Sequence, residues 1–253
     1  MELKVIAYAR NGHTDKFGIP RQSREDSPIV TRIVFEPEYA VAEALRGIEG
    51  YSHLWLLWGF SEVTDTPRTA ESLSWSPTVR PPRLGGNKRM GVFATRSPFR
   101  PNPIGLSSVR LLGVHQNGKS KNINDEVHPI HGESGRLELI VTGADLLDGT
   151  PIYDIKPYLS FSDCHPEAVN GFAEETKDYG LRVMEYGLRE TEKGERIPEE
   201  VLRDIEYILR QDPRPAYQDD PARAYKMDYA GYTITFFVEN QTVLIKNIEK
   251  LPN

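Results

Sequence analysis

Residues 96–107 place two arginines among three prolines, in the sequence RSPFRPNPIGLS. Each proline fixes its backbone φ angle and lacks an amide donor, so the segment is expected to be a rigid, extended loop and not a helix. A rigid loop loses little conformational entropy when it binds a ligand. The guanidinium groups of Arg96 and Arg100 are fork-shaped donors suited to carboxylates or phosphates.

Two other segments have residue types suited to ligand binding. Residues 17–22 read FGIPRQ, and residues 145–158 read DLLDGTPIYDIKPY. The Asp148-Gly149 pair predicts a turn that leaves a carboxylate and several main-chain groups facing outward, where hydroxyls or an ammonium group could bind. Together the three segments predict rigid, charged ligand loops on a β scaffold, without naming the ligand.

The charge of the chain is unevenly distributed. Residues 72–124 contain no Asp or Glu, although the whole chain has a net charge of −6. Nine of the 31 basic side chains lie in this stretch, which leaves 22 against 37 acidic side chains elsewhere. One electropositive face on an acidic protein is typical of a polyanion partner. The alternative is a chance exclusion in a loop rich in proline and glycine. The nine residues are Arg80, Arg83, Lys88, Arg89, Arg96, Arg100, Arg110, Lys119 and Lys121.

Short strands must hold these segments. Apolar or β-branched runs separated by Gly, Pro and Asn predict strands over 3–8, 53–60, 90–95, 104–114 and 137–141. One short helix is expected over 39–45. Many short strands with few helical periods favour a mainly β fold, a barrel or a sandwich. Trp55 and Trp58, on the apolar run at 53–60, are expected in the core, whereas Trp75 beside the basic stretch is the better candidate for base stacking.

The composition changes after Tyr158, and we predict a domain boundary near residue 165, with domains 1–165 and 166–253. Pro198 starts a helix whose apolar stripe is Val201, Ile205, Ile208 and Leu209, and Asp212-Pro213 ends it. Two strands over 232–238 and 242–248 follow. The second domain is therefore predicted to be a small α+β unit.

The motifs RSPFRPNPIGLS, DLLDGTPIYDIKPY and GIPRQ together resemble the TsaA-like family of β-barrel methyltransferases. Residues 74–87 and 212–217 resemble its longer, TrmO-type members, which methylate N6 of threonylcarbamoyladenosine beside the tRNA anticodon. The resemblance covers nearly the whole chain. It implies S-adenosylmethionine (SAM) as methyl donor, a barrel in place of a Rossmann scaffold, and a homodimer with its site near the subunit interface.

The resemblance also implies which residues contact SAM. They lie in the Pro-Arg-Gln triplet, on the apolar strand, in the proline-rich loop and in the Asp-Gly-Thr-Pro turn. These residues are Pro20, Arg21, Gln22, His53, Leu54, Arg96, Leu106, Asp148, Gly149, Thr150 and Pro151.

Methylation of a urea-like nitrogen such as N6 of threonylcarbamoyladenosine requires loss of a proton, so a general base would help. Asp154, Asp148 and Tyr158 are the polar groups nearest in sequence to the implied SAM turn, and Asp154 ranks first as base. Lys156 could hold the carboxylate of the threonyl group. The alternative for Asp154 is a structural role in capping a turn.

The basic stretch is expected to bind phosphates of the anticodon stem-loop through Arg80, Arg83, Lys88, Arg89 and Arg100. The alternative functions for the chain are a small-molecule methyltransferase, a non-enzymatic SAM sensor and an RNA-binding barrel that does not use SAM.

No metal is expected, because the spacing of His128 and His131 fits no zinc motif. Cys164 is the one cysteine, which fits a reducing compartment, and no secretory signal or apolar run of about 20 residues is found. A cytoplasmic protein is therefore expected.

Overall fold

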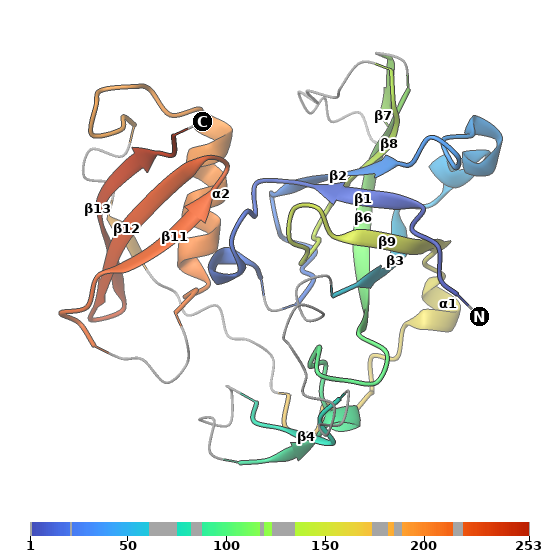
Figure 1. Cartoon of the computed structure of the whole chain (residues 1–253), viewed down its shortest axis with the longest axis horizontal. Helices are drawn as coiled ribbons and strands as arrows, with labels where there is room; N and C mark the ends of the chain where they lie inside the picture. The colour runs from blue at the N-terminus through green and yellow to red at the C-terminus, as the bar shows by residue number, and fades with distance from the viewer. Residues whose placement is uncertain are drawn as a thin grey trace. The chain divides into compact units, whose positions relative to one another are not determined.

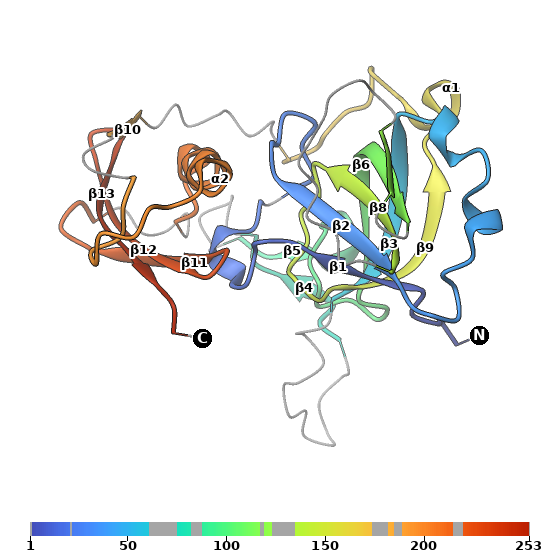
Figure 2. The same ribbon diagram turned by 90° about the horizontal axis from the view of Figure 1, so that it is seen from above.

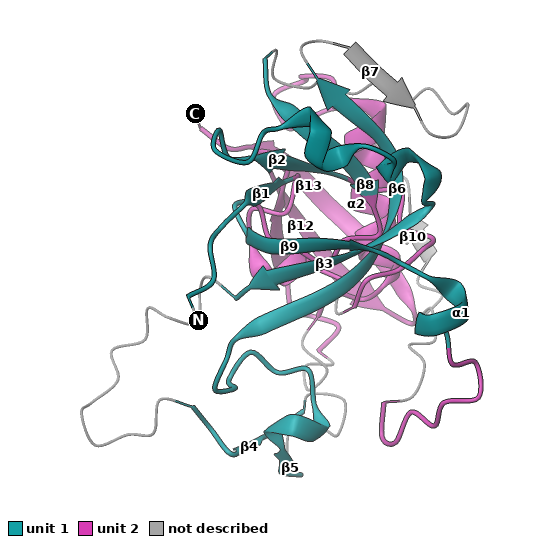
Figure 3. Ribbon diagram, turned by 90° about the vertical axis from the view of Figure 1, so that its right-hand side faces the viewer, with its two compact units in different colours: residues 1–10, 31–141, 149–164 teal, residues 11–30, 142–148, 165–253 magenta. Residues whose placement is uncertain are grey.

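The computed structural model describes residues 2–20, 22–60, 75–81, 88–116, 119–122, 135–173, 182–184, 189–214 and 220–252. The chain divides into two compact units, coloured separately in Figure 3. Unit 1 comprises residues 1–10, 31–141 and 149–164, and unit 2 comprises residues 11–30, 142–148 and 165–253. The predicted boundary at residue 165 stays a prediction.

Within the described chain, six strands of unit 1 form a closed barrel (Figures 1 and 2). The order is β3-β9-β1-β2-β8-β6, and β6 pairs back with β3, so no strand of this ring has an open edge. A further strand, β7 (Lys119–Asn122), forms a hairpin with β6. The prediction of a mainly β fold built on a barrel is confirmed. The six strands are β1 (Ala7–Arg10), β2 (Val30–Phe35), β3 (His53–Gly59), β6 (Ile104–Gln116), β8 (Leu137–Thr142) and β9 (Pro151–Pro157).

The barrel core follows from the two-residue period of its strands. On β3, Leu54 and Leu56 are fully buried and Trp58 is nearly so, while the alternate side chains face outward. The Trp58 indole lies over Gly105 of β6, where an added Cβ would be 2.2 Å from the ring. Its Nε1 donates to Ser107 Oγ at 2.9 Å. Only glycine at position 105 leaves room for this tryptophan.

Three local predictions in unit 1 were wrong in extent. The first strand is Ala7–Arg10 and not residues 3–8. The helix expected over 39–45 is a 3-10 turn, Ala42–Leu45. The strand expected over 90–95 is only β5 (Met90–Gly91), paired with β4 (Thr78–Val79) and followed by a 3-10 turn at Val92–Ala94. A β-rich run without a long partner strand cannot continue its ladder. Unit 1 ends in a short helix, α1 (Ser160–Asp163).

Unit 2 contains a four-stranded sheet with one helix, α2 (Glu199–Arg210), against one face (Figure 2). The strand order is β10-β13-β12-β11. The predicted helix and both predicted C-terminal strands are confirmed. As its apolar stripe predicts, α2 buries Ile205, Ile208 and Leu209. The strands are β10 (Arg182–Met184), β11 (Tyr225–Tyr229), β12 (Tyr232–Glu239) and β13 (Thr242–Lys250).

The connection between β1 and β2, residues 11–29, packs into the core of unit 2. Ile29 is 1% exposed and belongs to the same apolar cluster as α2 and β11–β13, and Phe17 packs against that cluster. An added Cβ at Gly18 would be 3.6 Å from Ile208, and Gly12 lies under the Tyr229 ring, with its main-chain oxygen accepting from Ala230 N at 2.8 Å. Unit 2 is therefore built from segments far apart in the sequence.

Candidate active site

Strand β3 presents a second set of side chains on the outside of the barrel. Because Leu54, Leu56 and Trp58 face the core, His53, Trp55 and Leu57 face outward, and all three are half-buried. Directly paired residues of neighbouring strands lie on the same face of a sheet. The register of β3 with β6 and β9 therefore decides which other side chains share this face.

Register brings predicted residues from three separate motifs to this face. Leu57 of β3 pairs with Leu106 of β6 on one side and with Asp154 of β9 on the other. Trp55 pairs with Lys156 of β9. Leu106 is 53% exposed, an unusual position for a leucine on a sheet. We call this group the outer face; it consists of His53, Trp55, Leu57, Leu106, Asp154, Lys156 and Tyr158.

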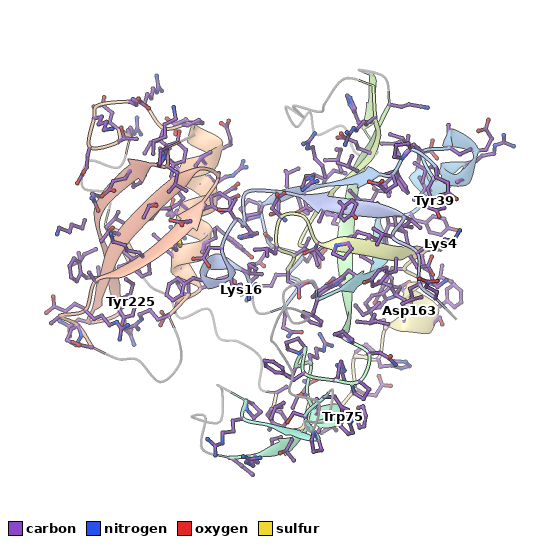
Figure 4. All side chains as sticks on the ribbon, viewed as in Figure 1. Lys4, Lys16, Tyr39, Trp75, Asp163 and Tyr225 are labelled. Atoms are coloured by element: carbon purple, nitrogen blue, oxygen red, sulfur yellow. The ribbon has the colours of Figure 1, made fainter. Side chains whose placement is uncertain are left out.

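Trp55 is fixed by α1. Its Nε1 donates to Asp163 Oδ2 at 2.7 Å, and the same carboxylate oxygen accepts from Leu159 N at 3.0 Å. Its ring centroid lies 5.5 Å from that of Tyr158. Asp163, the last residue of α1, is labelled in Figure 4. The expectation that Trp55 is a core residue was wrong, whereas Trp58 is in the core as predicted. Strict alternation along β3 was the signal that assigns the two tryptophans to opposite faces.

His53 is oriented by a hydrogen bond of 2.9 Å between its Nδ1 and Ser52 Oγ. Its ring centroid lies 6.1 Å from that of Tyr158, whose main-chain N donates to His53 O at 3.0 Å. Leu54 lies on the opposite face of β3 and its side chain is fully buried. A contact of Leu54 with a ligand could therefore involve only its main chain.

Asp154 and Lys156 form an ion pair on β9. Lys156 Nζ lies 2.8 Å from Asp154 Oδ2, and both side chains are well exposed. Asp154 Oδ1 accepts from Ile155 N at 2.9 Å. Each carboxylate oxygen has two lone pairs, so Asp154 keeps capacity to accept a proton or a hydrogen bond. A substrate carboxylate that binds Lys156 must compete with Asp154.

The phenol of Tyr158 is held in its neutral form. Desolvation raises the pKa of Tyr158, and the neighbouring Cys164 and Asp163 raise it further. A phenol with a raised pKa donates a hydrogen bond at neutral pH and does not act as a base. Among the predicted catalytic groups, Asp154 is therefore better suited to accept a proton and Tyr158 to donate.

The Asp148–Pro151 turn is held by main-chain contacts. In unit 2, Asp148 Oδ1 accepts from Asn11 N at 3.1 Å, and Asp148 N donates to His13 O at 2.8 Å. In unit 1, Gly149 adopts a φ of 79°, its N donates to Ala9 O, and Thr150 is 3% exposed. The Asp148 carboxylate thus ties its turn to Asn11 of the β1–β2 connection.

The Pro-Arg-Gln triplet is only partly described. Arg21 lies outside the described residues, and Pro20 and Gln22 follow the 3-10 turn Lys16–Gly18 in unit 2. Asp15 caps that turn, since its side chain accepts from Phe17 N at 3.4 Å.

Most predicted RNA-binding residues lie on or beside the β4–β5 hairpin of unit 1. Val79 of β4 pairs with Met90 of β5. Arg80 directly follows Val79 and Arg89 directly precedes Met90, so the two arginines lie at the same end of the hairpin. Lys88 precedes Arg89. Arg96 and Arg100 lie in the following proline-rich loop, and Arg83 lies outside the described residues.

The described residues include no group of three or more His, Cys, Asp or Glu side chains arranged to hold a metal ion. His128 and His131 lie outside the described part of the chain. No helix in the described ranges is both long enough and apolar enough to cross a lipid bilayer.

Comparison with known proteins assigns the chain to a class. Residues 8–164 match the model of the tRNA-methyltransferase O N-terminal domain, and residues 188–251 match that of the TrmO C-terminal domain. A tRNA (adenine(37)-N6)-methyltransferase of Eikenella corrodens is 41% identical over 198 residues, covering 78% of this chain and 97% of that protein.

Two further matches come from Pseudomonas aeruginosa. One, named as a proposed S-adenosylmethionine-dependent methyltransferase, is 42% identical over 228 residues, covering 88% of this chain and 86% of that protein. The other is the crystal structure of TrmO from that organism, with a TM-score of 0.69 and 33% identity, covering 98% of this chain and 97% of that one.

These matches define the class as a tRNA methyltransferase built on a closed β-barrel. The chain belongs to the tRNA-methyltransferase O family, and the resemblance noted in the sequence is confirmed.

Proposed function

We propose that this protein transfers a methyl group from SAM to N6 of threonylcarbamoyladenosine at position 37 of tRNA. Membership of the family supports a tRNA adenine-N6-methyltransferase, and the threonylcarbamoyl substrate is the further step. The observation that carries this step is the pairing of Asp154 and Lys156 on the outer face, a proton acceptor next to a cation. A threonyl carboxylate beside a weakly acidic N6–H needs both groups.

The residues of the outer face fit SAM as a ligand. Leu106 offers exposed apolar surface next to Leu57, and Trp55 and Tyr158 offer aromatic surface, all suited to a nucleoside. His53 and Tyr158 add polar groups at the edge of that surface. When bound, SAM supplies an electrophilic methyl group on a sulfonium centre. Pro20, Arg21, Gln22, Arg96 and the Asp148–Pro151 turn remain proposed cofactor contacts.

The protein's own contribution is orientation and proton removal. N6 of threonylcarbamoyladenosine is conjugated with a carbonyl group, so it becomes nucleophilic as its proton leaves. Asp154 would accept that proton, and Lys156 would hold the threonyl carboxylate and so orient N6. Tyr158, as a neutral donor, would bind an oxygen of the substrate. If Lys156 binds the substrate carboxylate, its ion pair with Asp154 breaks. Substrate binding would therefore leave the Asp154 carboxylate available to accept the proton.

The test uses purified protein, SAM with a labelled methyl group, and two tRNA preparations, with and without the threonylcarbamoyl group. After digestion, nucleosides are analysed by mass spectrometry. We expect label on N6 only in the modified tRNA. Label on unmodified adenosine 37 would refute the substrate assignment while keeping the enzyme class. Label in no nucleoside, with SAM bound, would favour a SAM sensor or a small-molecule methyltransferase.

Asp154→Asn tests the base. This change removes proton-accepting ability while keeping shape, so turnover should fall by about 10²–10⁴-fold with SAM affinity nearly unchanged. The matched control is Asp220→Asn, an exposed residue of unit 2, which should leave turnover unchanged. Turnover of Asp154→Asn equal to that of the wild type would remove Asp154 from the mechanism.

We further propose that the protein acts as a homodimer, which the resemblance implies, and that it works in the cytoplasm, which fits its single cysteine. Sedimentation velocity at micromolar concentration tests the assembly, and a monomer under conditions that support turnover would refute it.

A further inference from the structure

An aromatic pair, half-buried Trp75 and exposed Phe93, lies beside the β4–β5 hairpin. The rings of Trp75 and Phe93 lie 5.9 Å apart at an interplanar angle of 30°. Phe93 is 73% exposed, and Phe99 in the adjoining loop is 51% exposed. Figure 4 labels Trp75 at this hairpin. Large aromatic side chains are normally buried, so a group of them on the surface indicates a binding site.

The backbone that carries these rings is held by a network of hydrogen bonds. Ser76 N donates to Phe99 O at 3.3 Å, and Val92 N donates to Pro77 O at 3.0 Å. Thr95 Oγ1 donates to Val92 O at 2.8 Å and accepts from Ser97 N at 3.2 Å. The strand, the 3-10 turn and the proline-rich loop are thus joined to one another. A ligand that binds the rings therefore loses little conformational entropy in ordering this backbone.

Basic side chains lie on the same hairpin and in the adjoining loop. Arg80, Lys88 and Arg89 are exposed, and Arg89 Nη1 donates to Thr78 Oγ1 at 3.0 Å, which fixes its position. Within the described ranges, Arg80, Lys88, Arg89 and Arg100 form no ion pair with a carboxylate. The stretch 72–124 has no acidic residue, so none of its own side chains neutralises its positive charge. We call this the aromatic–cationic surface; it consists of Trp75, Arg80, Lys88, Arg89, Phe93, Phe99 and Arg100.

We propose that the aromatic–cationic surface binds an unstacked base of a single-stranded RNA loop, with its cations on the flanking phosphates. Exposed rings accept the face of any base, and nearby guanidinium and ammonium groups bind the backbone. The inference rests on the proposed function in taking the anticodon loop as that RNA. A base that leaves the loop's stack when the target adenosine is exposed would be held on this surface.

The charge of this surface argues against a second copy of the chain as its occupant. A two-fold symmetric interface places the same patch of each subunit against itself. Here that arrangement would bring arginines and lysines of both subunits together, which is unfavourable without compensating acids. A polyanion has the complementary charge.

The experiment measures binding of a fluorescently labelled anticodon stem-loop RNA by anisotropy, without SAM. Phe93→Ala should weaken binding by about tenfold through lost stacking, and Phe93→Trp should retain it. The matched control is Phe161→Ala, because Phe161 is a phenylalanine of α1 with 87% exposure outside this surface. It should leave RNA affinity unchanged. Equal affinity of Phe93→Ala and wild type would overturn the proposal.

Salt dependence separates the stacking contacts from the ionic ones. Arg89→Gln should reduce the slope of log Kd against log salt by about one, while Phe93→Ala should leave the slope unchanged. If Phe93→Ala instead converts a dimer into a monomer in sedimentation velocity, the occupant is a second copy and the proposal fails. Wild-type protein that binds the stem-loop through Phe93 but transfers no methyl group would refute the proposed function and leave this inference standing.

Discussion

His13 makes the stability of unit 2 depend on pH in a way that can be worked out from its surroundings. The side chain is 1% exposed, and neither ring nitrogen has a hydrogen-bond partner among the described residues. Its ring meets the Tyr229 ring edge-on, with centroids 5.2 Å apart. Burial lowers the pKa of His13 from 6.5 to about 4, because the charged imidazolium would lose its hydration without gaining a partner.

The sign and size of the effect follow from that shift. The folded protein binds a proton at His13 only near pH 4, whereas the unfolded chain binds it near pH 6.5. The neutral imidazole therefore stabilises the fold fully above pH 6.5, and this stability is lost as the pH falls toward 4. The total loss is about 3 kcal/mol, of which about 2 kcal/mol falls between pH 7.5 and 5.

The assay compares wild type with His13→Phe, which keeps a ring against Tyr229 but cannot titrate. The free energy of unfolding is measured in urea from pH 7.5 to 5, with pulsed hydrogen exchange of β12 and β13 peptides to report unit 2. The advantage of His13→Phe over wild type should grow by about 2 kcal/mol across this range. At pH 7.5 the replacement should be close to neutral, since it removes two unpartnered polar atoms.

One neighbouring titratable group, Asp204, bears on the interpretation. Burial raises the pKa of the Asp204 carboxyl, which accepts a hydrogen bond of 2.7 Å from Tyr229 Oη, so protonation of Asp204 stabilises the fold as the pH falls. That contribution is common to wild type and variant and cancels in their difference. His165→Phe, at an exposed position, is the control and should follow the wild-type pH profile. Parallel profiles for wild type and His13→Phe would refute the reasoning.

Two further predictions concern the barrel. Gly105→Ala should destabilise unit 1 by about 1–3 kcal/mol, because the added Cβ would clash with the Trp58 ring. Urea unfolding followed by tryptophan fluorescence measures this loss of stability, and a loss below about 0.5 kcal/mol would contradict the prediction. Arg32→Met should cost about 3–5 kcal/mol, because Glu138 is fully buried and accepts from Arg32 Nη1 at 3.3 Å. The double change Arg32→Met, Glu138→Leu should recover most of that loss in the same assay, and no recovery would assign the cost to packing.

Elements with a strong local pattern could be predicted from the sequence. The apolar run at 53–60 became β3, and the stripe of Ile205, Ile208 and Leu209 became the buried face of α2. The C-terminal hairpin followed from two β-rich runs joined by Asn240 and Gln241, which both adopt positive φ. In each case the residues that decide the structure lie within one element.

Elements whose structure depends on residues far away in the sequence were harder to predict. Residues 90–95 have strand-like composition, yet only Met90 and Gly91 find a partner strand. Strand β2 (Val30–Phe35) was not predicted, although its β-branched residues were a usable signal. The packing of Phe17 and Ile29 into unit 2 depends on residues almost 200 positions away, and no local pattern indicates it.

In the candidate site, too, single residues could be predicted from local motifs, whereas their arrangement depends on distant parts of the chain. Motif resemblance pointed to Leu106, and closeness in sequence to the implied SAM turn pointed to Asp154 and Lys156. Only the strand register shows that the three share one face with Leu57. The role of Asp163 in orienting Trp55 could not be predicted, because a helix of four residues brings it there. Arg21 and Arg83 lie outside the described residues, so their predicted contacts stay predictions.

The packing of residues 11–30 into unit 2 limits how the gene could be shortened. A fragment that ends after α1 would retain every barrel strand, but it would expose Phe17 and Ile29 without the apolar cluster that covers them. Such a fragment should aggregate or be cleaved by proteases within residues 11–30, even if its barrel folds. Engineering a minimal enzyme from this chain therefore requires replacing the β1–β2 connection, or polar substitutions within it, and not only removal of the C-terminal residues.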